Sequence, residues 1–175
     1  MTSEGKKFIV VGGGIGGLAA AVALSQQGVH VTVLEQAAEL GEIGAGVQLG
    51  PNAFAALDAL GVGENARKRA VFTERLIMMD AVDGSEVGSF PVGQAFRDRF
   101  NNPYAVIHRA DIHTSILEAA QDSHLIQVET STKVANVAQD DAGVTAIDQN
   151  GRVFKADALI AADGVRSVIR EKMFN

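Results

Sequence analysis

The chain has 175 residues, of which 47% are hydrophobic and 21% charged, a composition typical of a globular domain with a substantial core. The net charge of −6 and the lack of a basic patch argue against nucleic acid as a partner. The absence of cysteine excludes disulfides, thiol catalysis and zinc–thiolate sites. Glycines interrupt the first apolar stretch, which favours neither a signal peptide nor a membrane span. We therefore expect a soluble, cytoplasmic protein that does not bind membranes.

The first fifty residues predict a βαβ unit. Residues 7–12, KFIVVG, and residues 30–35, HVTVLE, are apolar, β-branched runs typical of buried strands. Between them, residues 14–27 carry apolar side chains at helical spacing, and Gly28 is a helix stop. Two strands joined by one helix in this length should be parallel. Residues 36–50 are rich in glycine and are predicted to be a loop.

The middle of the chain predicts helices and a hairpin. Pro51 suits the first turn of a helix that ends near Leu60. Residues 75–82 and 85–92 are strand-like and are joined by Asp83-Gly84, a hairpin signal. A strand at 104–109 precedes a helix near 112–121, for which Asp111 is the predicted N-cap.

The last fifty residues are mostly strand-like. Predicted strands lie near 125–130, 133–139, 143–148 and 152–155, and the last two are joined by the turn signal Asn150-Gly151. Residues 158–162 form a last buried strand, followed by a short helix from about Ser167. The fold class is therefore α/β with antiparallel excursions.

Residues 12–17, GGGIGG, contain the pattern G-x-G-x-x-G between the first strand and the first helix. Gly12 makes the tight turn, Gly14 lets the backbone approach a pyrophosphate, and Gly17 lets the helix pack close to the strand. Glu35 ends the second strand, where its carboxylate can accept hydrogen bonds from a ribose and would repel a 2′-phosphate. The pattern does not separate FAD from NAD, and a glycine-rich turn in another βαβ protein is the alternative.

Residues 163–170, DGVRSVIR, form a second motif. The strand before it delivers Asp163 to the carboxyl end of a sheet, where open α/β folds bind ligands. Gly164 permits a close backbone approach, and Ser167 can cap the helix that follows. An ordinary capped turn between strand and helix is the alternative interpretation.

The two motifs, in this order, resemble those of flavoprotein monooxygenases of the p-hydroxybenzoate hydroxylase type, which carry G-x-G-x-x-G and a later D-G-x-R-S-x-x-R. Residues 42–52, EIGAGVQLGPN, are similar to the family's loop beneath the flavin, and residues 108–113, HRADIH, to the segment whose arginine reaches FAD. The resemblance covers nearly the whole chain and is greatest to the 3-hydroxybenzoate 6-hydroxylase and salicylate hydroxylase branch. It implies a Rossmann-like FAD-binding fold of three layers, with a parallel sheet and an antiparallel β meander, here incomplete.

The resemblance also implies a role for individual residues at the cofactor. The implied cofactor-binding residues are Gly12, Gly14, Ile15, Gly16 and Gly17 at the pyrophosphate, Glu35 with the adjacent Gln36 at the adenosine ribose, Val47 and Gln48 near the isoalloxazine, Arg109 at the phosphate or ribityl group, Val134 at the adenine through its backbone, and Asp163 with Gly164 near the pyrophosphate. Arg109 could instead be a surface salt-bridge residue. His108 and His113 are better explained as packing or surface histidines than as acid–base or metal groups, and no metal site is expected.

In the family, NADH reduces FAD, the reduced flavin reacts with O2, and a C4a-hydroperoxyflavin transfers a hydroxyl group to a phenolic ring. The resemblance thus implies a small aromatic acid as substrate, with 3-hydroxybenzoate converted to gentisate. A salicylate hydroxylase, another FAD-dependent oxidoreductase and a non-catalytic nucleotide-binding module are the alternatives. No catalytic residue is assigned, since the base that activates the phenol is expected outside this sequence.

The family's chain continues beyond D-G-x-R-S to a G-D motif and most of the substrate pocket, and neither occurs here. We therefore expect residues 1–175 to be the N-terminal part of an FAD-binding domain, with the C-terminal half absent. Residues 73–100 are expected to contribute strands to the substrate-side sheet. Such a chain should not hydroxylate by itself, and a homo-oligomer is one way to cover apolar surface left exposed.

Overall fold

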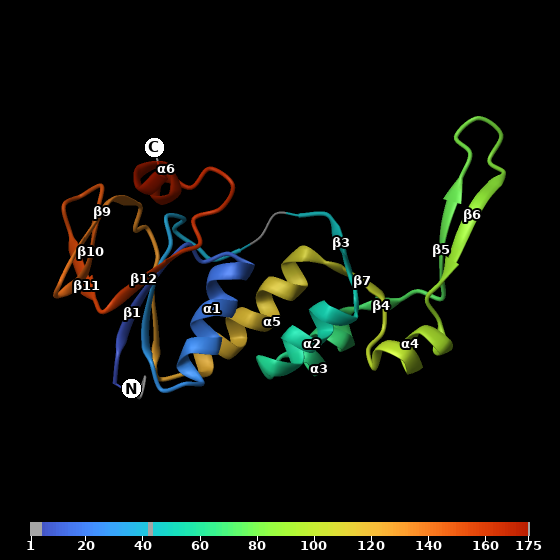
Figure 1. The fold of residues 1–175 in the computed structure, drawn as a ribbon, viewed down its shortest axis with the longest axis horizontal. Helices are drawn as coiled ribbons and strands as arrows, with labels where there is room; N and C mark the ends of the chain where they lie inside the picture. The colour runs from blue at the N-terminus through green and yellow to red at the C-terminus, as the bar shows by residue number, and fades with distance from the viewer. Residues whose placement is uncertain (1–4, 42–43, 175) are drawn as a thin grey trace. The chain divides into compact units, whose positions relative to one another are not determined.

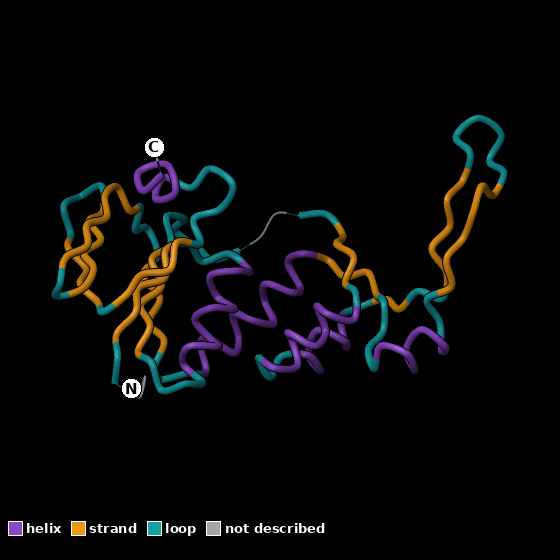
Figure 2. The backbone as a smooth tube through the Cα atoms, viewed as in Figure 1, coloured by secondary structure: helices purple, strands orange, loops and turns teal. Residues whose placement is uncertain are grey.

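The computed structural model describes residues 5–41 and 44–174. The chain forms two compact units: the first unit, residues 1–42 with 113–175, and the second unit, residues 43–112. Figures 1 and 2 show the elements of each by chain position and by type. Helix α5 (Arg109–Asp122) begins in the second unit and continues in the first.

A four-stranded parallel sheet lies at the centre of the first unit, in the order β12-β1-β2-β8. Its strands are β1 (Lys7–Val11), β2 (His30–Leu34), β8 (Ile126–Glu129) and β12 (Ala158–Ala161). Helix α1 (Ile15–Ser25) joins β1 to β2, which confirms the predicted parallel βαβ unit. Gly28 has a φ of +75° in the turn after α1, a conformation that suits glycine at a helix stop.

The two faces of this sheet carry different layers, because alternate residues of a strand point to opposite sides. On one face, Val10, Val31 and Val33 pack with Ala21 of α1. The other face is covered by an antiparallel meander in the order β11-β10-β9 and by a last helix. These elements are β9 (Val134–Asp140), β10 (Gly143–Asp148), β11 (Val153–Ala156) and α6 (Val168–Phe174).

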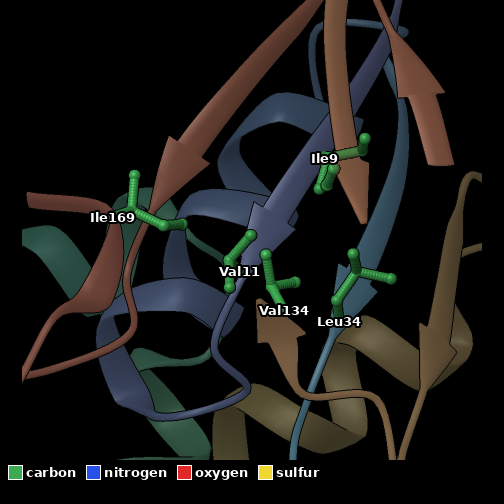
Figure 3. Close-up of a cluster of buried hydrophobic side chains, with 6 residues drawn as sticks. Ile9, Val11, Leu34, Val134 and Ile169 are labelled. Carbon is green, nitrogen blue, oxygen red and sulfur yellow. The ribbon is translucent and has the colours of Figure 1, made fainter. Parts of the chain in front are cut away.

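The core between sheet and meander is a cluster of buried aliphatic side chains (Figure 3). Its members are Ile9, Val11, Leu34, Val134, Ala146 and Ile169. Helix, parallel sheet and meander thus form the three layers of the expected α/β fold, which the structure confirms (Figure 1).

The second unit contains a small antiparallel sheet in the order β3-β7-β4, three helices and a hairpin. Its elements are β3 (Gly46–Leu49), α2 (Pro51–Ala59), α3 (Gly63–Arg69), β4 (Val71–Phe72), β5 (Arg75–Met79), β6 (Glu86–Pro91), α4 (Gln94–Phe100) and β7 (Ala105–His108). Phe54 of α2 and Ile107 of β7 are among its buried residues. The predicted helix at Pro51 and the predicted hairpin are confirmed, and β5 and β6 stand out as a pair of strands in Figure 2.

Three predictions on local structure were wrong. Residues 36–50 are not entirely loop, because β3 lies within them and pairs with β7. The hairpin does not turn at Asp83-Gly84 alone: the strands end at Met79 and Glu86, and Asp80 and Asp83 accept backbone N–H groups within the longer turn.

The third wrong prediction is the N-cap of α5. The helix begins at Arg109, so Asp111 lies inside the first turn rather than before it. The Nδ1 atom of His108 accepts the backbone N–H of Ala110 at 3.3 Å, which is the hydrogen bond of an N-cap side chain.

Among the described residues, no helix is both long enough and apolar enough to cross a membrane.

Candidate functional site

The carboxyl ends of three adjacent strands meet at one edge of the parallel sheet in the first unit. Gly12 follows β1, Glu35 follows β2, and Ala162 and Asp163 follow β12. The N–H of Gly12 donates to Leu34 O at 2.8 Å, and the N–H of Ala162 donates to Val11 O at 2.8 Å. Open α/β sheets bind ligands at this edge, so the structure brings the two sequence motifs together where a ligand is expected.

Two glycines of the turn are required by close backbone approaches. Gly12 has a φ of +108°, and a Cβ atom there would overlap the carbonyl oxygen of Ala162. Gly17 is buried, and its Cβ atom would overlap the carbonyl oxygen of Gly12. Gly16, by contrast, is exposed, and a Cβ atom there would meet nothing within 4 Å. The protein's own packing therefore demands glycine at positions 12 and 17 but not at position 16.

The N-terminus of α1 lies at this edge, and its first N–H groups have no partner within the helix. Gly14 is the N-cap, and it has no side chain with which to cap the helix. The first turn contains no acidic residue, and the first helical hydrogen bond runs from Leu18 N to Gly14 O at 2.9 Å. The preceding N–H groups and the positive end of the helix dipole are the features that bind a diphosphate.

The carboxylate of Glu35 is hydrogen-bonded to the glycine turn. Its Oε2 atom accepts the N–H of Gly13 at 2.6 Å, and its Oε1 atom accepts the N–H of Ala37 at 2.8 Å. Each carboxylate oxygen has a second lone pair, so acceptor capacity remains for ribose hydroxyls. Gln36, the next residue, is exposed in the loop that follows β2.

Gly13 contributes to the site although the pattern leaves its position free. It is buried, and a Cβ atom there would lie 3.2 Å from the Glu35 carboxylate and 2.5 Å from the Leu40 side chain. Its carbonyl oxygen lies 2.8 Å from Nε2 of His113, which is only 2% exposed. His113 is thus a buried residue in contact with the glycine turn. No local sequence signal points to this contact, since the two residues are 100 positions apart.

The second motif forms a capped turn at the end of β12. Ser167 donates its hydroxyl to Asp163 Oδ1 at 2.6 Å, and its Oγ atom accepts the N–H of Arg170 at 3.0 Å. Asp163 Oδ2 accepts the N–H of Ile169 at 3.2 Å, so the predicted capping of α6 is confirmed and the aspartate shares it. Gly164 has a φ of +82° and open space around it, which leaves the backbone accessible.

Val134 begins β9, and its side chain is buried in the core beside Leu34 (Figure 3). The contact of its backbone with an adenine stays a prediction. The loop before it is attached to the end of β2, because Thr132 N–H donates to Glu35 O at 2.7 Å and Ser131 N–H donates to Ala37 O at 2.8 Å.

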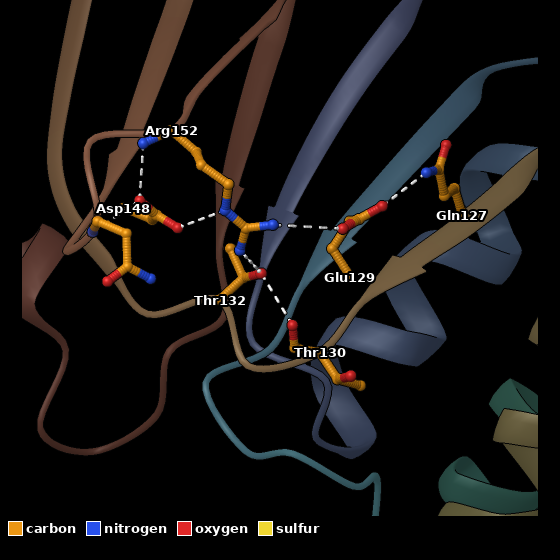
Figure 4. Close-up of polar contacts among 7 residues, drawn as sticks. Gln127, Glu129, Thr130, Thr132, Asp148 and Arg152 are labelled. Atoms are coloured by element: carbon orange, nitrogen blue, oxygen red, sulfur yellow. Dashed lines mark hydrogen bonds and ion pairs between the residues drawn. The ribbon is translucent and has the colours of Figure 1, made fainter.

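A polar network holds that loop in place (Figure 4). Arg152 donates to Thr132 Oγ1 at 2.5 Å and to Asp148 Oδ2 at 2.7 Å, and lies 3.7 Å from a carboxylate oxygen of Glu129. Burial raises the pKa of Asp148, but hydrogen bonds from the Arg152 guanidinium and from the N–H groups of Arg152 and Asn150 outweigh it and hold the pKa below its usual value. Arg152 therefore links the meander to the loop that contacts Glu35.

The remaining predicted residues lie in the second unit, where β3 runs antiparallel to β7. Val47 pairs with Ile107, and Gln48 accepts the Tyr104 hydroxyl at 2.7 Å through Oε1. Arg109 donates its backbone N–H to Ala45 O at 3.3 Å.

Gly44 packs against Arg109, because a Cβ atom on this glycine would lie 2.9 Å from Cβ of the arginine. Residues 42 and 43 of the predicted flavin loop lie outside the described residues. The flavin contacts of Val47, Gln48 and Arg109 stay predictions.

A groove elsewhere in the first unit is a poorer candidate. It is lined by Lys7, His30, His124, Lys155 and neighbouring residues, beside the amino ends of β1, β2 and β8. Parallel sheets bind ligands at the opposite edge, where the glycine turn lies. Within the described part of the chain, no group of three or more His, Asp or Glu side chains is placed to hold a metal ion.

Comparison with known proteins identifies the family of the chain. Residues 6–174 match the family described as FAD binding domain. The chain is 60% identical to 3-hydroxybenzoate 6-hydroxylase of Polaromonas naphthalenivorans (strain CJ2) over 164 residues, which is 94% of this chain and 41% of that protein. It is 56% identical to the 3-hydroxybenzoate 6-hydroxylase of Klebsiella oxytoca, covering 95% of this chain and 42% of that protein.

Solved structures of similar fold include flavoproteins. Klebsiella pneumoniae HpxO complexed with FAD and uric acid matches with a TM-score of 0.81 at 29% identity, covering 97% of this chain and 42% of that one. The tetrameric form of 2-methyl-3-hydroxypyridine-5-carboxylic acid oxygenase matches with a TM-score of 0.84 at 25% identity, covering 97% of this chain and 42% of that one. The chain thus spans less than half the length of these relatives. It belongs to the FAD binding domain family, in the branch that contains the FAD-dependent aromatic monooxygenases.

Proposed function

We propose that this chain is the FAD-binding portion of a flavoprotein monooxygenase that hydroxylates 3-hydroxybenzoate to gentisate with NADH and O2. The observation that carries the proposal is the edge of the parallel sheet, where the glycine turn, Glu35 and Asp163 meet. Identities of 46–60% to three proteins named 3-hydroxybenzoate 6-hydroxylase support the choice of substrate over salicylate.

The first unit suits the ADP half of FAD. The first-turn N–H groups of α1 would bind the diphosphate, and the close approaches at Gly12 and Gly17 hold the turn in the required shape. Glu35 would accept the adenosine ribose hydroxyls, and its charge disfavours a 2′-phosphate at the same place. Gly164 and the backbone beside Val134 would complete the contacts with the pyrophosphate and adenine. In the second unit, Val47 and Gln48 would lie near the isoalloxazine, and Arg109 would contact the phosphate or ribityl group.

Bound FAD would supply the redox chemistry that links NADH, O2 and the aromatic substrate. The protein's contribution here is to bind and orient the cofactor. Within this architecture, residues 1–175 would be the N-terminal part of the FAD-binding domain, and residues 73–100 would add strands to a sheet on the substrate side. We place the protein in the cytoplasm, in the catabolism of aromatic acids, and expect it to form homo-oligomers.

Cofactor binding is tested by titrating the purified chain with FAD, ADP and FMN. FAD and ADP should compete for one site, whereas FMN, which lacks the adenosine half, should bind at least ten times more weakly. A folded chain that binds FMN as well as FAD, or that binds neither FAD nor ADP, would contradict the proposal. The Glu35→Ala variant tests the ribose contact, because it removes the proposed acceptor at the end of β2.

The proposed activity is tested in a chimera. The corresponding portion of the Polaromonas naphthalenivorans relative is replaced by this chain, and NADH oxidation is followed with 3-hydroxybenzoate or salicylate present. Stimulation by 3-hydroxybenzoate with release of gentisate supports the proposal. Because most of the substrate pocket then comes from the relative, the test asks whether this chain supports that reaction. A chimera that contains FAD but is not stimulated by 3-hydroxybenzoate would contradict the proposal.

A further inference from the structure

His113 is a buried, titratable side chain that the proposed function does not use. It lies on α5 in the first unit, is 2% exposed, and places Nε2 at 2.8 Å from the carbonyl oxygen of Gly13. A carbonyl oxygen can only accept, so Nε2 must carry the hydrogen and donate it. His113 therefore binds the backbone of the glycine turn itself.

The peptide units on either side of Gly13 are held by different side chains. The N–H of Gly13 donates to Glu35 at 2.6 Å, and the carbonyl of Gly13 accepts from His113 at 2.8 Å. In a trans peptide the carbonyl and the following N–H point in opposite directions, and the described chain has no cis peptide. The bond from His113 thus fixes the direction of the Gly14 N–H.

Gly14 is the N-cap of α1, so its N–H stands at the helix end that would bind the diphosphate. Glycine residues at 12, 13 and 14 give this segment wide conformational freedom unless other groups hold it. A donor that is already oriented binds an anion without the cost of ordering the loop.

We infer that His113 is a positioning residue for the cofactor pyrophosphate: it sets the Gly13–Gly14 peptide so that the Gly14 N–H is directed at a phosphate oxygen. The inference rests on the proposed FAD site. His113 acts through Gly13, and its imidazole stays in the protein interior.

The test compares the intact chain with His113→Leu and His113→Gln. Leucine removes the donor, whereas the Nε2 amide of glutamine can occupy the place of the imidazole Nε2–H. Dissociation constants are measured for FAD, ADP and adenosine, the last by NMR at millimolar concentration. His113→Leu should bind FAD and ADP about tenfold more weakly, which corresponds to about 1.4 kcal/mol. His113→Gln should stay within about threefold of the unchanged chain, the size of effect left when a hydrogen bond is largely retained.

Adenosine distinguishes positioning from a general structural role, because it keeps the ribose and base but has no phosphate. Its affinity should be unchanged in His113→Leu. Equal loss of adenosine and ADP binding, or unchanged FAD binding, would overturn the inference while leaving the proposed function intact. If the unchanged chain binds neither FAD nor ADP, the proposed function fails instead. If His113→Leu does not fold, His113→Asn replaces it, because the asparagine side chain is too short to donate to the Gly13 carbonyl.

Discussion

Replacing Gly17 by alanine tests most directly whether the close packing of α1 against the turn after β1 requires glycine. The added Cβ atom would overlap the carbonyl oxygen of Gly12, which is backbone and cannot rotate away as a side chain could. Helix α1 would have to move away from β1. We therefore expect Gly17→Ala to destabilise the fold even though alanine favours helix.

The size of the effect follows from two opposing contributions. Overpacking of a close contact costs about 1–3 kcal/mol, and alanine in place of a helical glycine returns about 0.5–1 kcal/mol. Gly16→Ala is the matched control, because it lies one residue earlier in α1 and a Cβ atom there meets nothing within 4 Å. It should gain the helix contribution alone, so the two variants should differ in unfolding free energy by about 2 kcal/mol.

The assay is thermal and urea unfolding followed by circular dichroism, without cofactor. For a chain of this length, a difference of about 2 kcal/mol separates the midpoints by roughly 4–8 °C. Equal midpoints for the two variants, or a more stable Gly17→Ala, would refute the argument that this glycine is required by the approach of helix and strand.

Three further changes test the rest of the site. Glu35→Gln keeps only one acceptor oxygen for two backbone N–H groups. FAD affinity measured by fluorescence should therefore fall roughly tenfold, as for loss of a charge-assisted hydrogen bond. Unchanged affinity would rule out a role of Glu35 in FAD binding. Ser167→Ala should lower the unfolding free energy by about 1 kcal/mol in urea, because the capping hydrogen bond of α6 is lost. Because the pKa of Asp148 is lowered by folding, its stabilising effect is present above the unfolded pKa of about 3.9 and is lost as the pH falls. Asp148→Asn and Arg152→Gln should each flatten the pH dependence of stability below about pH 4, and their combination should add little; additive effects would show that the pair does not act as a unit.

The strands and helix that carry the site could be predicted because their signals are local. The apolar runs of β1 and β2, the glycine turn between them and the stop at Gly28 lie within a few residues of the elements they define. The capped turn after Asp163 is equally local, since all of its hydrogen bonds join residues at most six positions apart.

Two features that the sequence did not predict, strand β3 and the contact of His113, depend on distant partners, whereas the N-cap of α5 is local. Strand β3 lies in a glycine-rich stretch and exists because it pairs with β7, where Gly46 faces His108. The N-cap of α5 was placed at Asp111 from residue type alone, whereas the side chain of His108 makes that hydrogen bond. The contact between His113 and Gly13 spans 100 positions and could be seen only in the folded chain.

The most direct test of the central claim is an NMR titration of the ¹⁵N-labelled chain with ADP, which maps the ligand onto the backbone. We expect the largest shifts on residues 12–17, 35–37 and 163–164, where three strand ends meet. Shifts centred instead on the groove at Lys7 and His30, at the amino ends of the same strands, would contradict it.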